Sequence, residues 1–185
     1  MGGDRLAEVL DATYDCLTRF GVRRTTMDDI ATAVGMSRSA VYQYVRNKDD
    51  AVRRVAGRLH DQALARAEAV ASTELPPADR VRGILQAKLD LVLALAGASP
   101  HTAELLDAKA RLYGDICTDF TTRLRQLLAE VFTEAGISTV EPTEAADIGI
   151  ALVVGLESTH DARRLLGPAT EALLTGLLGA PDAAR

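Results

Sequence analysis

Between residues 19 and 58 the sequence concentrates side chains that can bind a polyanion. This segment holds nine basic and four acidic residues, a net charge of +5, although the 185-residue chain carries −5 in total. The rest of the chain therefore carries −10. Within the segment, Arg38 and Gln43 have groups that can form two parallel hydrogen bonds with a base edge. One short stretch is suited to nucleic acid, whereas the remainder is not.

Two short helices joined by a glycine turn are expected around these side chains. Thr26, with Asp29 three residues later, has the spacing of a capping box that starts a helix, and Gly35 ends it. Ser37 is a suitable N-cap for a third helix, from Arg38 to about Val45. Longer helices are predicted on either side, over 4–20 with Gly21 as its C-terminal cap, and over about 49–70. This arrangement is a helix-turn-helix.

The remaining chain has the apolar spacing of further helices. A break with paired prolines spans 72–79, and helices are predicted over about 77–96, 100–107, 109–135, 143–160 and 168–178. Aromatic residues make up only 4% of the chain, whereas Ala and Leu, which favour helices, are abundant. The sequence therefore predicts an all-α protein.

The motif around the two short helices resembles the DNA-binding signature of the TetR/AcrR family of transcriptional regulators. The matching residues are Gly21, Thr26, Ile30, Ala31, Gly35, Met36, Ser37, Val41, Tyr42, Tyr44, Lys48 and Asp49. Val45 and Val52 stand where the family more commonly has Phe and Leu, and both remain apolar. The resemblance covers about 40 residues; the rest matches in length and helical pattern only.

The resemblance implies about nine helices in two domains. Residues 1–50 form a three-helix helix-turn-helix domain that binds DNA, the fourth helix (49–70) connects, and residues 51–185 form a helical bundle for effector binding and dimerisation. It also implies a homodimer on double-stranded DNA with a palindromic operator. The implied function is a repressor that an unidentified small-molecule effector releases.

The third helix is expected to read bases. Arg38 would pair with guanine and Gln43 with adenine, while Ser39 and Ala40 would meet phosphates or a thymine methyl group. The expected phosphate contacts are Thr26, Tyr42, Tyr44 and Lys48, and Ser37 is chiefly a helix cap with a phosphate bond as a second role. Two alternatives remain open: Arg38 is a solvated surface residue, or the Tyr42 ring packs against the first helix.

Polar side chains on otherwise apolar helices are candidates for an effector pocket. The candidate lining residues are Leu89, His101, Leu105, Tyr113, Cys117 and Glu157. A small core residue is the alternative for Cys117, and a helix-start residue after Pro100 is the alternative for His101. An apolar lining with few charges indicates a hydrophobic effector.

Leucines and small residues near the C-terminus predict a dimer interface. Its candidates are Leu152, Leu156, Leu173 and Leu177, with core packing inside one protomer as the alternative. In the dimer interpretation, the two helices from each protomer would form a four-helix contact.

Several other classes are not supported by the sequence. His60, His101 and His160 lack metal-ligand spacing, so neither a metal nor a cofactor is expected. No hydrolase, metalloprotease or nucleotide-binding fingerprint is present, which argues against an enzyme such as a Cys117/His101 hydrolase. The longest apolar stretches run about ten residues, well short of the ~20 that span a bilayer, and the N-terminus has no signal-peptide pattern. A cytoplasmic protein with reduced thiols is expected.

Two functions compete. In the first, a ligand-controlled regulator changes the spacing of its recognition helices when an effector binds. In the second, the same DNA-binding unit answers to a protein partner and takes no small effector. An enclosed apolar pocket favours the first, and an exposed apolar groove beside a packed core favours the second.

Overall fold

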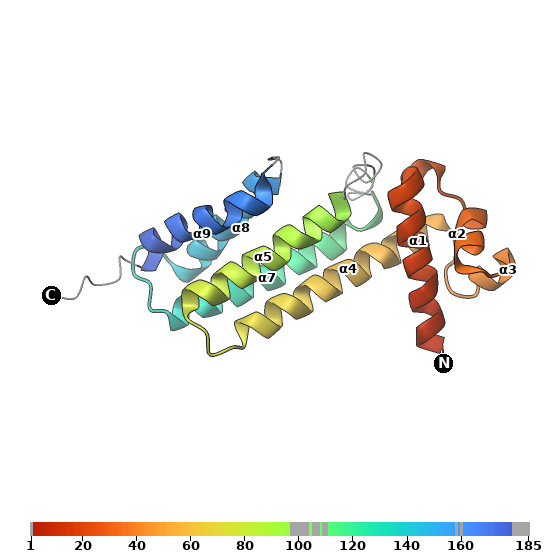
Figure 1. The fold of residues 1–185 in the computed structure, drawn as a ribbon. Helices are drawn as coiled ribbons and strands as arrows, with labels where there is room; N and C mark the ends of the chain where they lie inside the picture. Colours follow the sequence, from red (N-terminus) through yellow and green to blue (C-terminus); the bar gives the residue numbers. More distant parts are fainter. Residues whose placement is uncertain are drawn as a thin grey trace. The chain divides into compact units, whose positions relative to one another are not determined.

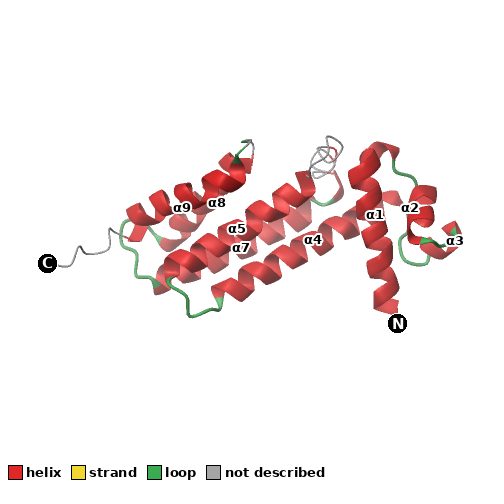
Figure 2. Ribbon diagram, viewed as in Figure 1, coloured by secondary structure: helices red, strands yellow, loops and turns green. Residues whose placement is uncertain are grey.

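The computed structural model describes residues 2–96, 104, 108, 111–157, 159 and 161–178. Its helices are α1 (Gly2–Arg24), α2 (Met27–Val34), α3 (Arg38–Val41), α4 (Lys48–Ala71), α5 (Pro77–Ala96), α7 (Gly114–Glu134), α8 (Pro142–Glu157) and α9 (Ala162–Leu178), shown in Figure 1. No strand occurs among the described residues (Figure 2), so the all-α prediction is confirmed. The predicted helix over 100–107 lies outside them, apart from Glu104, which is helical.

By internal packing the chain divides into two compact units. The first comprises Met1–His60 and Ala94–Cys117, and the second comprises Asp61–Leu93 and Thr118–Arg185. The boundary therefore falls inside α4, ten residues beyond the functional boundary expected after residue 50, and the first unit also includes a later segment of the chain.

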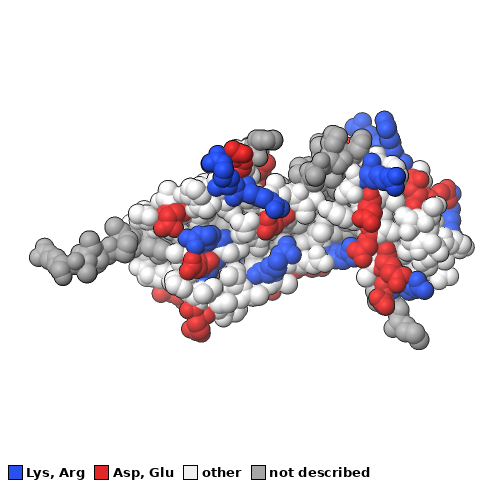
Figure 3. Space-filling model, in the orientation of Figure 1, with Lys and Arg blue, Asp and Glu red and all other residues white. Residues whose placement is uncertain are grey.

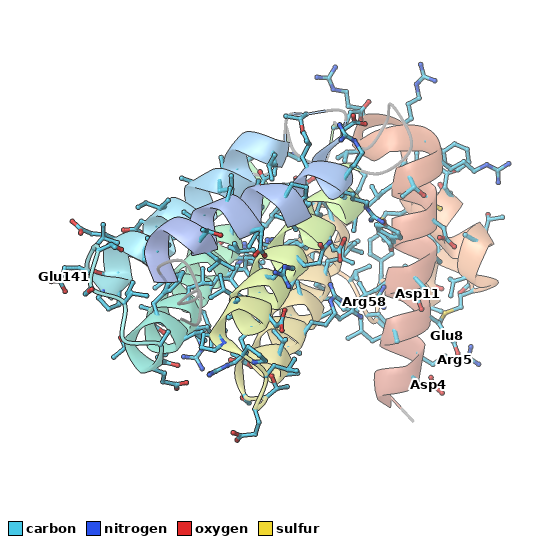
Figure 4. The ribbon with its side chains drawn as sticks, turned by 60° about the vertical axis from the view of Figure 1, so that its left-hand side comes forward. Asp4, Arg5, Glu8, Asp11, Arg58 and Glu141 are labelled. Carbon is cyan, nitrogen blue, oxygen red and sulfur yellow. The ribbon has the colours of Figure 1, made fainter. Side chains whose placement is uncertain are left out.

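The core of the first unit joins α1, α2, α3 and the start of α4. Its buried residues are Val9, Leu10, Cys16, Met27, Ile30, Ala31, Val41, Val45, Ala51 and Val55. Ion pairs add to it at the surface: Arg58 of α4 donates to Asp11 of α1 at 2.6 Å (Figure 4), and Arg53 donates both Nη groups to Asp115. Arg53 holds the pKa of the Asp115 carboxyl well below its usual range. The buried core therefore holds the short helices α2 and α3 against α1 and α4, and the ion pairs join longer helices to one another.

The second unit packs α5 with α7, α8 and α9. Its fully buried side chains include Ile84, Leu85, Leu89, Leu124, Leu128, Phe132 and Leu166. Arg80 of α5 pairs with Glu134 of α7 at 2.6 Å, and Arg82 of α5 pairs with Glu171 of α9 at 2.8 Å. Gly149 of α8 faces the Leu85 side chain of α5, where an added Cβ would lie 3.5 Å from it. Helix α5 is thus in contact with three neighbours.

The first predicted helix end agrees with the structure in part. The helix was expected to stop at Gly21, and its regular backbone is interrupted there, with φ of 82° and ψ of 165°; a further helical turn to Arg24, which was not predicted, follows within α1. The Glu104 carboxylate accepts the Arg23 backbone N–H at 2.8 Å and lies 2.9 Å from where a Cβ of Gly21 would be. A partner from residue 104 therefore stabilises the added turn, and sequence spacing does not show such a partner.

The last helix begins earlier than predicted. It was expected to start at Pro168, but α9 starts at Ala162 and carries Pro168 inside it. Proline removes the hydrogen bond to the carbonyl four residues earlier, which belongs to Arg164. Both residues are exposed, so water can satisfy that carbonyl, while Leu166 and Thr170 are buried and hold the helix in place. No described helix is long and apolar enough to cross a bilayer.

Candidate DNA-binding surface

The predicted capping box starts α2. The Thr26 hydroxyl oxygen accepts the Asp29 backbone N–H at 3.2 Å, and the Thr26 backbone N–H donates to Asp29 Oδ2 at 2.8 Å. The same hydroxyl donates to Asp29 Oδ2 at 2.7 Å. These bonds lower the pKa of the Asp29 carboxyl. The Thr26 hydroxyl proton is therefore already used inside the box.

A left-handed glycine and a serine cap turn the chain from α2 into α3. Gly35 has φ of 69° and ψ of 31°, the αL conformation that glycine adopts without a Cβ penalty. Ser37 then accepts the Ala40 backbone N–H at 3.2 Å through its hydroxyl oxygen. Its role as an N-cap is confirmed. The predicted helix to Val45 is only four residues long and continues as turns over 42–44.

Two buried valines fix which face of α3 meets solvent. Val41 is 0% exposed and Val45 is 1% exposed, and both belong to the core of the first unit. The neighbouring residues are more accessible. Ala40 is half-buried, and the exposed residues are Arg38, Ser39, Tyr42 and Gln43. The five residues expected to contact bases or phosphates between Arg38 and Gln43 are therefore at least partly accessible.

Arg38 is held from two sides. Its Nη1 donates to Asp28 Oδ2 at 3.0 Å, and its Nη2 donates to the Tyr42 hydroxyl at 3.3 Å. Its guanidinium carbon also lies 5.7 Å from the centre of the Tyr42 ring. The bond to Tyr42 and the charge of Asp28 raise the pKa of Arg38. Sequence reasoning missed Asp28, since it lies ten residues from Arg38.

The two tyrosines and Lys48 occupy different environments. Tyr42 is 42% exposed and its ring lies by Arg38, whereas Tyr44 is half-buried and packs against the core of the first unit. Lys48 Nζ donates to the backbone carbonyl oxygens of Val22 and Arg23 at 2.9 and 3.3 Å. In this structure Lys48 therefore caps the C-terminal end of α1, and contact with phosphate stays a prediction for it.

Charges of both signs share the visible surface of the first unit. In Figure 3 acidic side chains run along α1, and basic side chains gather at the end of α1 that leads to α2. On the face that Figure 3 shows, the basic side chains of the first unit are therefore accompanied by acidic side chains of α1. Contact with DNA has to rely on specific groups as well as on charge.

The effector candidates in the first unit are buried. Tyr113 is 0% exposed and Cys117 is 9% exposed, and Cys117 Sγ lies 3.3 Å from Nε2 of His60. The other ring nitrogen of His60, Nδ1, is 2.7 Å from the Ala56 carbonyl oxygen, and the Tyr113 ring meets the His60 ring edge-on at 6.1 Å. Burial raises the pKa of Tyr113. No group of three metal-ligating side chains occurs among the described residues.

One of the effector candidates in the second unit, Glu157, is half-buried and forms an ion pair with a buried lysine. Leu89 is 0% exposed, and Glu157 accepts a hydrogen bond from Lys88 Nζ at 2.6 Å. Lys88 is 8% exposed and was not predicted. A surface hollow of about 640 Å³ in this unit has a mostly charged rim, which includes Glu68, Arg80, Arg123 and Glu134, and no effector candidate lines it. The candidates His101 and Leu105 lie outside the described residues.

The four leucines predicted to form the dimer interface are more buried within the single chain than residues of an exposed interface would be. Leu156 and Leu177 are 9% and 7% exposed within the single chain, and Leu152 and Leu173 are half-buried. Between residues 148 and 155 the exposed positions of α8 are Ile148, Ala151, Val154 and Gly155, all uncharged. Ile148 and Val154 are 42% and 52% exposed. Both residues lie in the helix predicted over 143–160, but neither is among the four leucines predicted as interface candidates.

Residues 9–55 match the family described as bacterial regulatory proteins of the tetR family. This range contains the capping box, the Gly35 turn and α3. The segment that carries these elements is therefore similar to that of tetR-family regulatory proteins. A curated relative, the probable HTH-type transcriptional regulator ArpR of Pseudomonas putida, is 31% identical over 113 residues, or 60% of this chain and 53% of ArpR. The chain thus spans about half the length of this curated relative.

Solved structures of two other proteins share the fold over nearly the whole chain. SmeT, the repressor of the multidrug efflux pump SmeDEF of Stenotrophomonas maltophilia, has a TM-score of 0.70 and 18% identity, covering 97% of this chain and 95% of SmeT. AibR, solved with isovaleryl coenzyme A and operator DNA, has a TM-score of 0.63 and 19% identity, covering 91% of this chain and 97% of AibR. At these identities the similarity shows the fold.

Proposed function

We propose that the chain is a DNA-binding transcriptional regulator that acts as a repressor in the cytoplasm. The observation that carries the proposal is the segment from α3 to Val45, in which the buried Val41 and Val45 leave Arg38 and Ser39 of α3 and Gln43 of the following turn exposed. An exposed helix of this kind in a helix-turn-helix is the element that enters the major groove. The proposal includes no catalytic activity.

Base and phosphate contacts divide between the exposed side chains. Arg38 and Gln43 read base edges, and Ser39 and Ala40 contact phosphate or a thymine methyl group. Tyr42, Tyr44, Lys48, Ser37 and the N-terminus of α2 at Thr26 contact phosphates and fix the register. The exposed Tyr42 and the accessible Ser37 support this division, and Lys48 would keep one N–H for phosphate beyond its two carbonyl bonds.

A homodimer places two recognition helices on one operator. The uncharged exposed positions of α8, from Ile148 to Gly155, together with Leu152 and Leu173, form the surface that a second copy would cover. Leu156 and Leu177 support it from inside the protomer. Two-fold symmetry then requires a palindromic site.

A small, mostly hydrophobic effector releases the operator. Residues 51–185 carry this role; Leu89 and Glu157 are the candidates in the second unit, and Tyr113 and Cys117 are those in the first. The second unit supports it in part, because Leu89 is fully buried and the half-buried Glu157 provides a polar group paired with Lys88. SmeT and AibR are relatives in fold whose names connect them with an efflux pump and an acyl coenzyme A, respectively.

Selection of random duplexes by the purified protein tests the proposal. At near-physiological salt we expect enrichment of a palindrome with half-sites about one helical turn apart. The control is the Arg38→Ala, Gln43→Ala double variant, which should fold and lose enrichment. Enrichment of no sequence by the wild type would contradict the proposal.

The selected duplex then separates the two modes of control. Hydrophobic acids, amines and neutral aromatic compounds are added one at a time to the protein–operator complex. Release of DNA by one class, with a higher Tm of the free protein, supports the small effector. Release by none, with a protein partner recovered on the operator complex, favours control by a protein.

A further inference from the structure

We propose that Asp28 determines the specificity of DNA binding by positioning Arg38 toward base edges and away from phosphates. The inference rests on the proposed function, because it assumes that α3 contacts a duplex. It adds Asp28, a residue of α2 that was not among the predicted DNA-binding residues, to those that determine which base sequence is bound.

The guanidinium of Arg38 is oriented by two different elements. Asp28 is the second residue of α2, and Tyr42 is the C-cap of α3. Asp28 takes the Nη1 group at 3.0 Å and the Tyr42 hydroxyl takes the Nη2 group at 3.3 Å, with the Tyr42 ring 5.7 Å from the guanidinium carbon. Because both terminal nitrogens of the guanidinium have a partner, its rotation is more restricted than it would be with one contact.

The ion pair contributes little to the fold. The side chains of Arg38 and Asp28 are 55% and 65% exposed, and an exposed pair in water is only weakly stabilising. The neighbouring Asp29 shows the contrast, because it is the acid that closes the capping box with Thr26. Two adjacent aspartates therefore have separate roles: Asp29 starts the helix, and Asp28 faces the arginine of the next helix.

A carboxylate beside Arg38 changes which DNA groups the arginine favours. Phosphates attract any free guanidinium on any sequence, and this attraction supplies most non-specific affinity. The carboxylate of Asp28 repels phosphates and balances the charge of Arg38. The guanidinium has five N–H donors and uses two here, so three remain for neutral acceptors such as guanine O6 and N7. The pair therefore weakens binding to the backbone more than binding to a base.

The Asp28→Asn variant tests the inference directly. Its affinity for random duplex should rise about three- to tenfold and its affinity for the selected operator should rise less, so the ratio of the two affinities falls. The slope of log K against log salt on random DNA should steepen by about one, because one more arginine then contacts phosphate. Both are measured by fluorescence anisotropy over a salt series.

Matched controls separate this role from charge alone. Glu8→Gln removes the same charge from an acid that pairs with Arg5 at 2.6 Å on α1, where Figure 4 shows both residues, and it should leave the affinity ratio unchanged. Asp28→Glu, which keeps the carboxylate, should have the wild-type ratio of operator affinity to random-duplex affinity. In an Arg38→Ala background, Asp28→Asn should no longer change the ratio, because Asp28 acts through Arg38.

The outcomes distinguish this inference from the function that underlies it. If the wild type enriches a site and Asp28→Asn keeps the wild-type ratio, the inference is wrong and the proposed function stands. If the wild type enriches no site, the proposed function fails. Circular dichroism of each variant establishes that it is folded, and Asp28→Ser gives a second variant without the carboxylate.

Discussion

Lys48 Nζ lies 2.9 Å from the carbonyl oxygen of Val22, so the first residue of α4 closes the last turn of α1. A second carbonyl, that of Arg23, lies 3.3 Å away. The last carbonyls of a helix have no partner inside the helix, and an ammonium group there is favoured by both hydrogen bonding and the helix dipole. A residue expected to hold phosphate is thus also part of the fold.

Replacing Lys48 with Met should affect stability and DNA binding differently. We expect the free energy of unfolding to fall by about 1 kcal/mol, because two carbonyls lose their donor. The salt dependence of operator binding should become shallower by well under one unit, because much of the hydrogen bonding of the ammonium is directed at the protein. Urea unfolding and anisotropy titrations measure the two effects. A full unit of change with unaltered stability would show that the phosphate contact dominates.

The capping box predicts an acid-sensitive contribution to stability. Thr26→Ala should lower the free energy of unfolding by about 1 kcal/mol at neutral pH. The Asp29 carboxyl has a lowered pKa when folded, so its contribution is complete above the ordinary value of about 3.9 and is lost as pH falls through the folded value. The Tm difference between the wild type and Thr26→Ala should therefore shrink below about pH 4.

Thr32→Ala is the matched control for the capping box. Thr32 is an exposed threonine of the same helix, away from its N-terminus. Its replacement should leave the Tm within about 1 °C of the wild type, since surface changes away from caps have small effects. An equal loss of Tm in both variants, at every pH, would contradict a specific role for the box.

The pair of Lys88 and Glu157 should behave as a buried ion pair. Glu157→Gln leaves a buried ammonium without its carboxylate, and we expect a loss of about 2 kcal/mol in the free energy of unfolding. The double variant Lys88→Met, Glu157→Leu should recover most of it, because neither charge is then buried.

Arg125 and Asp147 provide the control pair for this cycle. They lie 2.6 Å apart with side chains about half exposed, so Asp147→Asn should change the free energy of unfolding by less than about 0.5 kcal/mol. If the Lys88 and Glu157 variants show the same small effect, the pair is solvated in solution. If the rescued double variant also no longer responds to effector, Glu157 has a second role in binding it.

The exposed part of α8 gives a test of dimerisation that spares the fold. Ile148→Lys with Val154→Lys should convert the dimer to a monomer in sedimentation velocity without lowering Tm beyond the loss of the dimer, because both side chains are already exposed. Substitutions at Leu156 or Leu177 would not separate loss of the dimer from loss of folding, because both side chains are buried within the protomer.

Leu75→Lys is the corresponding control for dimerisation. Leu75 is 48% exposed and lies in the connection between α4 and α5, outside the sequence of α8 and α9. It should remain dimeric. An intact dimer in the Ile148→Lys, Val154→Lys variant would place the contact between copies on another surface.

Local signals in the sequence were enough for the turn and its caps. Thr26 with Asp29, Gly35 and Ser37 each act within three or four residues, and each was predicted and found. Contacts over longer separations could not be predicted this way. Asp28 meets Arg38 and Lys88 meets Glu157 only because the fold brings their helices together.

Helix ends were predicted less well, for the same physical reason. Gly21 interrupts the first helix as predicted, but the Glu104 carboxylate accepts the Arg23 N–H and a further helical turn follows to Arg24. Pro168 starts many helices, but here the exposed carbonyl of Arg164 tolerates the missing bond. The predicted third helix was too long because the backbone forms turns after Val41, where the N–H groups of Gln43 and Tyr44 donate to the carbonyl oxygens three residues earlier.

The buried Val41 and Val45 also bear on how such a protein could acquire a new target. Both are almost fully buried, whereas Ser39, before Val41, and Gln43, between the two valines, are exposed. Under the proposed function, folding constrains the valine positions and the operator sequence constrains the exposed ones. Mutations at Ser39 and Gln43 would then exchange one set of regulated genes for another while the packing of the domain stays the same, so a duplicated copy of the gene would diverge in target without first losing stability.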